Sequence, residues 1–99
     1  MVGSLYWTIL HLTEKYSASD EQLLQYFKTL GDKSRLDIVR LLKDRTYSGQ
    51  ELSKELGISQ GTVSHHLNIL IRDELISILK DGNRIRCTLN TGTVEHMIN

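Results

Sequence analysis

Residues 48–67 read SGQELSKELGISQGTVSHHL, and the fold class is inferred chiefly from them. Ser48, with Glu51 three residues later, forms a capping box that marks the start of a helix. Gly57 suits the left-handed position that ends a helix, and Ser59 suits the N-cap of the next one. The stretch therefore predicts two short helices joined by a tight turn, which is a helix-turn-helix.

Beyond the second of these helices, which is expected over about residues 60–73, the pattern changes from helical to strand-like. The β-branched content rises over residues 76–80, and residues 84–89 alternate polar and apolar side chains. Asp81-Gly82-Asn83 between them is a turn signal. A two-stranded β-hairpin is therefore predicted directly after the helix-turn-helix.

Three further helices are predicted on the N-terminal side, from apolar residues that recur at helical spacing. The first covers residues 4–16 and is followed by a break at residues 17–20. The second begins at a capping box of Ser19 and Gln22 and ends at Gly31, after which Asp32 caps the third. The residues expected on the inner face of the second helix are Leu23, Phe27 and Leu30.

Length and composition bound the class of protein. The chain has 99 residues, which is room for one domain, and 39% of them are apolar. Lys and Arg total 12 and Asp and Glu total 12, so charge alone does not indicate nucleic-acid binding. A single cysteine excludes an internal disulfide and favours a reducing, cytoplasmic location. Neither a membrane span nor a signal peptide is expected.

The first turn of the helix over residues 60–73 carries polar side chains on the side that the turn exposes. A short helix with hydrogen-bond donors and acceptors on its leading face suits the major groove of DNA. Its free backbone N–H groups suit phosphate. Lys80, Arg84 and Arg86 are expected at or near the hairpin tip, where they would touch DNA as a wing. The candidate DNA-contacting residues are Ser59, Gln60, Thr62, Ser64, His65 and Arg84.

Several of these segments resemble the ArsR/SmtB family of winged helix-turn-helix repressors. The segments are Leu30–Leu42 (LGDKSRLDIVRLL), Leu56–Gln60 (LGISQ), Thr62–Leu67 (TVSHHL) and Asp81–Arg84 (DGNR). The resemblance covers about residues 20–90, with turn, second helix and wing in register. It implies a dimeric prokaryotic repressor that leaves its operator when an effector binds, the effector being unknown, and it carries DNA contacts over to Gln60, Ser64, His65 and Arg84.

The sensor of that family is where the sequence departs from it. Ser48 and Gln50 stand where many members have a Cys-x-Cys metal motif, so no metal or cofactor is expected. A predicted C-terminal helix, residues 93–99, holds Glu95 and His96 without a second pair of ligands. The dimer interface is therefore expected in the extra N-terminal helix, within residues 1–18.

The histidines and the cysteine have purely structural interpretations as well as functional ones. His66 is expected to pack, half-buried, between helices, and Cys87 to be a small buried residue, although a redox-sensing thiol stays open. His11 and His96 are expected to be surface or interface residues. No phosphate loop, nucleophile elbow or His-Glu-x-x-His motif is present, so an enzyme is not expected.

The sequence thus predicts one mainly α domain over residues 1–99: a winged helix-turn-helix of about five helices and a two-stranded wing. The helix-turn-helix is assigned to residues 48–74 and the wing to residues 76–89. The expected function is sequence-specific binding of double-stranded DNA, as a homodimeric repressor on an inverted-repeat operator. Near-zero net charge leaves open a winged-helix protein-interaction module, and the short last helix leaves open a DNA-binding fragment of a longer regulator.

Overall fold

A computed structural model describes residues 17–98 of the chain. The helix predicted over residues 4–16, and with it most of the expected N-terminal interface, lies outside the described residues. The predicted winged-helix architecture is confirmed, with a two-stranded antiparallel hairpin after a helix-turn-helix. The elements are α2 (Ser17–Leu30), α3 (Lys33–Leu42), α4 (Gly49–Leu56), α5 (Gln60–Arg72), β1 (Ile76–Asp81), β2 (Arg84–Leu89) and α6 (Thr91–Ile98).

Helix α2 differs from its prediction in its start and in its buried face. It begins at Ser17, so the expected break at residues 17–20 is wrong. No Gly or Pro stands there and Ala18 is a strong helix former, so nothing interrupts the helix. Phe27 is 59% exposed whereas Tyr26 is only 4% exposed. Both residues fit the helical spacing from Leu23, so periodicity could not decide between them.

The core lies where α3, α4 and α5 meet the base of the hairpin. Asp32 caps α3 as predicted, its side chain accepting a hydrogen bond from the Arg35 N–H at 3.1 Å. Burying one large apolar side chain in this core stabilises the domain by roughly 1.5–3 kcal/mol. The largest fully buried side chains are Ile38, Leu52, Val63, Leu70, Leu75 and Ile76.

The hairpin lies at the predicted residues and makes one connection that the sequence did not indicate. Asp81 pairs with Arg84 across a turn in which Gly82 has φ +64°, a conformation that favours glycine. Tyr47, in the segment between α3 and α4, forms an isolated antiparallel bridge with Cys87 of β2. The segment before α4 thus lies alongside β2 and fixes the base of the wing.

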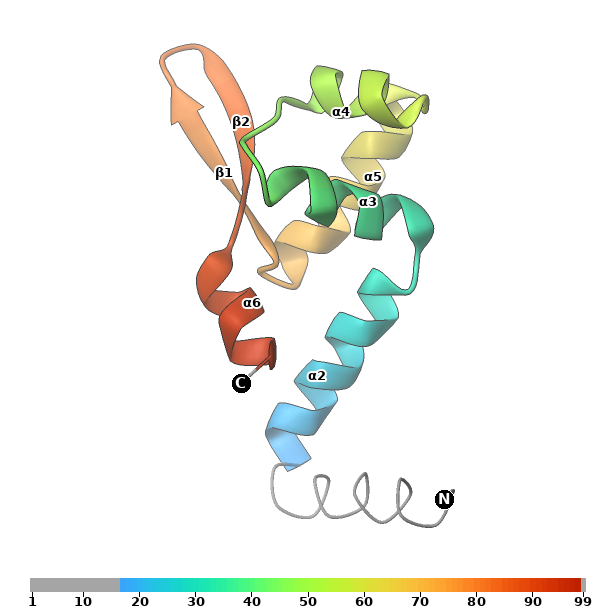
Figure 1. Cartoon of the computed structure of the whole chain (residues 1–99), viewed down its shortest axis with the longest axis vertical. Coiled ribbons are helices and arrows are strands. Elements are labelled where there is room, and N and C mark those ends of the chain that lie inside the picture. The colour runs from blue at the N-terminus through green and yellow to red at the C-terminus, as the bar shows by residue number, and fades with distance from the viewer. Residues whose placement is uncertain (1–16, 99) are drawn as a thin grey trace.

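Figure 1 shows that α4 and the hairpin tip lie at one end of the molecule, whereas α2 and α6 lie towards the other end. Helix α6 confirms the predicted C-terminal helix, although it begins at Thr91, two residues earlier than expected. Among residues 17–98, no helix is both long enough and apolar enough to span a bilayer. The candidate DNA-contacting residues lie towards the end of the molecule that carries α4, the start of α5 and the wing.

Candidate nucleic-acid interface

Local capping signals build the turn between α4 and α5. Ser48 and Glu51 form the predicted capping box, with the Glu51 N–H donating to Ser48 Oγ at 3.1 Å and the Ser48 N–H to Glu51 Oε1 at 3.0 Å. Gly57 takes the predicted left-handed conformation at φ +66°, and its N–H donates to the Ser53 carbonyl at 2.9 Å. The turn is therefore held by the residues that predicted it.

The start of α5 presents the polar surface that the sequence predicted. Ser59 caps it, accepting a hydrogen bond from the Thr62 N–H at 3.1 Å, and the two hydroxyl groups lie 2.9 Å apart. Val63, Leu67 and Leu70 of this helix are buried in the core. All five candidate residues of this helix start are exposed: Ser59, Gln60, Thr62, Ser64 and His65.

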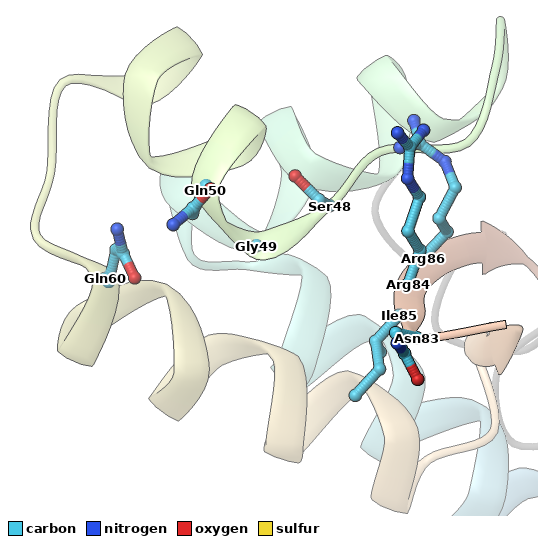
Figure 2. Close-up of a pocket in the computed structure, with 8 residues that line it drawn as sticks. All are labelled: Ser48, Gly49, Gln50, Gln60, Asn83, Arg84, Ile85 and Arg86. Atoms are coloured by element: carbon cyan, nitrogen blue, oxygen red, sulfur yellow. The ribbon is translucent and has the colours of Figure 1, made fainter. Parts of the chain in front are cut away.

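A shallow groove brings two of the candidate residues together from distant parts of the chain. Gln60 at the start of α5 and Arg84 at the start of β2 both line it (Figure 2). Its other lining residues come from the start of α4 and from the wing, and of these only Arg86 was expected from the sequence to touch DNA. They are Ser48, Gly49, Gln50, Asn83, Ile85 and Arg86.

Gln50 is the missed residue with the clearest chemistry. It is exposed in the first turn of α4, and it lines both the groove and a neighbouring hollow that also includes Gln60. A signal for it was present in the sequence, because a tight turn between two short helices brings α4 close to the start of α5. Two glutamine side chains, each able to donate and accept hydrogen bonds, therefore flank one groove.

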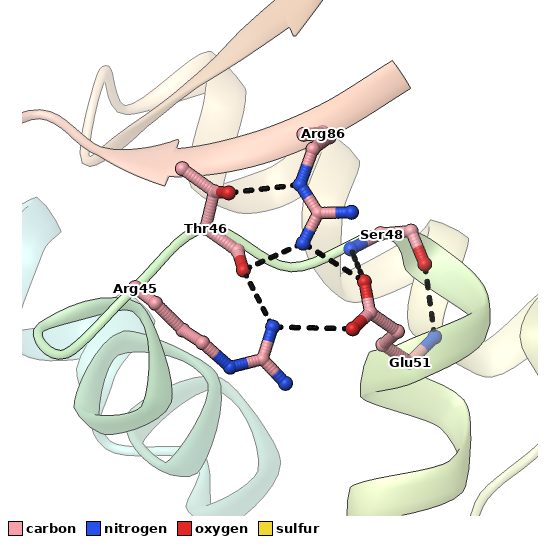
Figure 3. Close-up of polar contacts among 5 residues, drawn as sticks. All are labelled: Arg45, Thr46, Ser48, Glu51 and Arg86. Atoms are coloured by element: carbon pink, nitrogen blue, oxygen red, sulfur yellow. Dashed lines mark hydrogen bonds and ion pairs between the residues drawn. The ribbon is translucent and has the colours of Figure 1, made fainter. Parts of the chain in front are cut away.

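Arg86 does not lie free at the hairpin tip, and that expectation is wrong. Its guanidinium is bound to protein groups of the segment before α4 and of α4 itself, namely Thr46 and Glu51 (Figure 3). The reason is register: Arg86 pairs with Leu79, two positions further from the turn than Arg84. Lys80 and Arg84 are exposed, so these two cations remain available on the wing.

Glu51 carries a firmly held negative charge at the centre of this contact. The hydrogen bond from the Ser48 N–H and the one from the Arg45 guanidinium lower the pKa of the Glu51 carboxyl to about 2. Arg45 Nη1 lies 3.1 Å from Glu51 Oε2, and its guanidinium also stacks over the Tyr47 ring at 3.7 Å. Glu51 is therefore ionised at any pH at which the protein would meet DNA.

His66 and Cys87 confirm their structural interpretations. His66 is 8% exposed, and its Nδ1 lies 3.2 Å from Arg35 Nη1, which links α5 to α3. Cys87 is 2% exposed, and burial raises the pKa of its thiol, which disfavours the reactive thiolate that a redox sensor needs. In the part of the chain that the structure describes, no three His, Cys, Asp or Glu side chains cluster to hold a metal ion.

Comparisons with known proteins agree with this geometry. The family model described as "Bacterial regulatory protein, arsR family" matches residues 32–77, from the start of α3 into β1. The transcriptional repressor SdpR of Bacillus subtilis is 37% identical over 73 residues, which are 74% of this chain and 81% of that protein.

The transcriptional activator HlyU of Vibrio cholerae is 38% identical over 85 residues, covering 86% of this chain and 76% of that protein. The solved structure of reduced HlyU from Vibrio cholerae N16961 superimposes with a TM-score of 0.74 at 28% identity. That match covers 86% of this chain and 90% of the other.

Proposed function

This chain belongs to the arsR family of bacterial regulatory proteins and is a DNA-binding transcriptional regulator, and we propose that it is a dimeric repressor that reads its operator with α5. The family is one of regulators rather than enzymes, which confirms the expectation that the chain is not an enzyme. The observation that carries the proposal is the groove that Gln60 and Arg84 both line.

In the proposed complex α5 enters the major groove and the wing follows the backbone. Gln60, Ser64 and His65 face base edges, where glutamine pairs with adenine through two hydrogen bonds. Ser59 and Thr62 lie at the helix start, where hydroxyl and backbone N–H groups suit phosphate oxygens. Arg84 on the wing supplies a cation for the neighbouring backbone or the minor groove. Their common exposure supports this division of roles.

Dimerisation is proposed from the apolar surface that α2 leaves uncovered. Leu24 is 63% exposed and Phe27 is 59% exposed, on the end of the molecule away from the wing tip. A dimer would also double the cations that face DNA, which matters for a chain with no net charge. Two copies of α5 about one DNA turn apart, roughly 34 Å, would then read an inverted repeat.

Two experiments test these statements separately. Binding to operator DNA should fall and lose base preference in Gln60→Ala, whereas retained affinity and preference would remove α5 as the reader. Sedimentation equilibrium should give a dimer for the full chain and a shift towards monomer for Phe27→Ser. A wild-type monomer that still binds a palindromic site tightly would contradict the dimer.

A further inference from the structure

Arg86 makes the most connected polar contact between the wing and the helix-turn-helix (Figure 3). Its Nε donates to Thr46 Oγ1 at 2.8 Å, and its Nη2 donates to the Thr46 carbonyl at 2.8 Å. The same Nη2 lies 2.9 Å from Glu51 Oε1. The planar guanidinium is thus held by three acceptors, a geometry that a lysine ammonium cannot reproduce.

The acceptors of Arg86 are themselves fixed to the start of α4. Glu51 Oε1 also accepts the Ser48 N–H, and Thr46 directly precedes Tyr47, which bridges to Cys87. The depressed pKa of Glu51 keeps that partner charged. A continuous set of hydrogen bonds therefore runs from β2 to the first turn of α4, the turn that borders the DNA-facing groove.

Beyond Arg86 the hairpin extends with little support. Within the described residues, the distal segment 80–85 makes no hydrogen bond or ion pair to the body of the domain, and all six of its residues are exposed. Arg84 lies two positions from Arg86, on the same face of β2, at a distance of roughly 7 Å along the strand. The contact at Arg86 is thus the last anchor before the cation that is proposed to touch DNA.

We propose that Arg86 is a positioning residue that fixes the angle of the wing against α4, so that Arg84 reaches the DNA backbone while Gln60 lies in the major groove. This inference rests on the proposed DNA contacts of Arg84 and Gln60. The Nε and Nη2 groups of Arg86 are engaged by Thr46 and Glu51, so its proposed role is to hold the wing and not to bind phosphate.

Arg45 offers a matched control within the same cluster. Its Nη1 donates to the Thr46 carbonyl at 2.9 Å and pairs with Glu51 Oε2 at 3.1 Å, so it shares the Thr46 carbonyl and the Glu51 carboxylate with Arg86. It stands before α4 and not on the wing, so its loss removes one positive charge from the same cluster and leaves the wing tied. A difference between Arg86→Met and Arg45→Met therefore reports on the wing.

The test measures operator affinity by fluorescence anisotropy for five variants of the full chain, each checked for folding by thermal unfolding. Arg86→Met should weaken binding about tenfold, near the loss of one specific contact, and Arg86→Lys by a similar factor although it keeps the charge. Arg45→Met should stay within about twofold of the wild type. In an Arg84→Ala background, Arg86→Met should add no more than about twofold, because the contact that it positions is gone.

Wild-type affinity in Arg86→Lys, or full additivity with Arg84→Ala, would overturn the proposal, since either would make Arg86 a plain electrostatic contact. A second readout needs no DNA: the ¹H–¹⁵N heteronuclear NOE of the Gly82 and Asn83 amides. The NOE should fall in Arg86→Met and Arg86→Lys and not in Arg45→Met. An unchanged NOE in the two Arg86 variants would overturn the positioning role, whatever their affinity for DNA. If the wild-type protein bound no DNA, the proposed function would fail while the NOE still decided whether Arg86 holds the wing.

Discussion

Replacement of Glu74 by glycine should stabilise the protein, because Glu74 is held in a backbone conformation that suits glycine. It has φ +59°, the one non-glycine residue with positive φ among residues 17–98. The Glu74 N–H donates to the Ile71 carbonyl at 2.9 Å and the Leu75 N–H to the Leu70 carbonyl at 3.0 Å. These two bonds make a Schellman motif that ends α5, with glutamate at its left-handed position.

The magnitude follows from two opposed terms. A left-handed conformation costs a residue with a Cβ atom roughly 1–2 kcal/mol, and glycine loses about 0.4–1 kcal/mol more on folding through its freer unfolded chain. Glu74→Gly should therefore gain about 0.5–1 kcal/mol, which raises the Tm of a domain of this size by roughly 2–8 °C. The Glu74 side chain is exposed and, in the described part of the chain, makes no hydrogen bond or ion pair, so nothing offsets the gain.

Urea and thermal unfolding followed by circular dichroism measure this effect. Glu74→Ala is the matched control, because it removes the same carboxylate and keeps the Cβ atom. Its stability should stay near that of the wild type. A glycine variant no more stable than the alanine variant would refute the assignment of strain to this position.

Four further outcomes follow from the same structure. Gln60→Ala should cost roughly 1–3 kcal/mol of operator binding and relax base preference; unchanged anisotropy curves against operator and mismatched duplexes would reject α5 as the reader. Arg84→Ala should weaken binding to all sequences alike and lower the salt slope by about one, whereas lost preference at a single base pair would make Arg84 a base reader. Gly61→Ala should raise stability to urea by roughly 0.5–1 kcal/mol, because the nearest atom to an added Cβ is Ser59 Oγ at 3.9 Å; destabilisation would mean that this turn of α5 is not regular helix. The folded-state pKa of Glu51 is depressed to about 2, so the stability that its carboxylate contributes is complete above the ordinary pKa near 4.5 and is lost as pH falls from there towards 2. The Glu51→Gln variant keeps a capping side chain without the charge, and its urea midpoint should vary less over that pH range than the midpoint of the wild type. Equal pH dependence of the two proteins would contradict the stabilising role of the carboxylate.

The sequence predicted those parts of the fold that depend on neighbours along the chain. Ser48, Glu51, Gly57 and Ser59 each act within three or four residues, and the structure has every one in its predicted role. Capping and turn chemistry are local, so the pattern of residue types was sufficient to place α4, α5 and the turn between them.

What the sequence did not predict depends on packing between distant segments. The bridge from Tyr47 to Cys87 and the hydrogen bonds from Arg86 to Thr46 join residues about 40 positions apart. Such pairs have no signature in spacing, and Arg86 was therefore placed with the free cations of the wing. The same limit applies to α2, where periodicity allowed either Tyr26 or Phe27 inside. The DNA-contacting roles of the exposed residues on α5 and the wing stay predictions.

Fluorescence anisotropy across a salt series measures whether the surface formed by α5, α4 and the wing reads DNA. The probes are a random duplex and a library of genomic upstream duplexes. Tight, selective binding is expected that weakens steeply with salt, with a logarithmic slope of about 0.9 for each phosphate neutralised. Absence of binding at low salt by a folded, dimeric protein would contradict it.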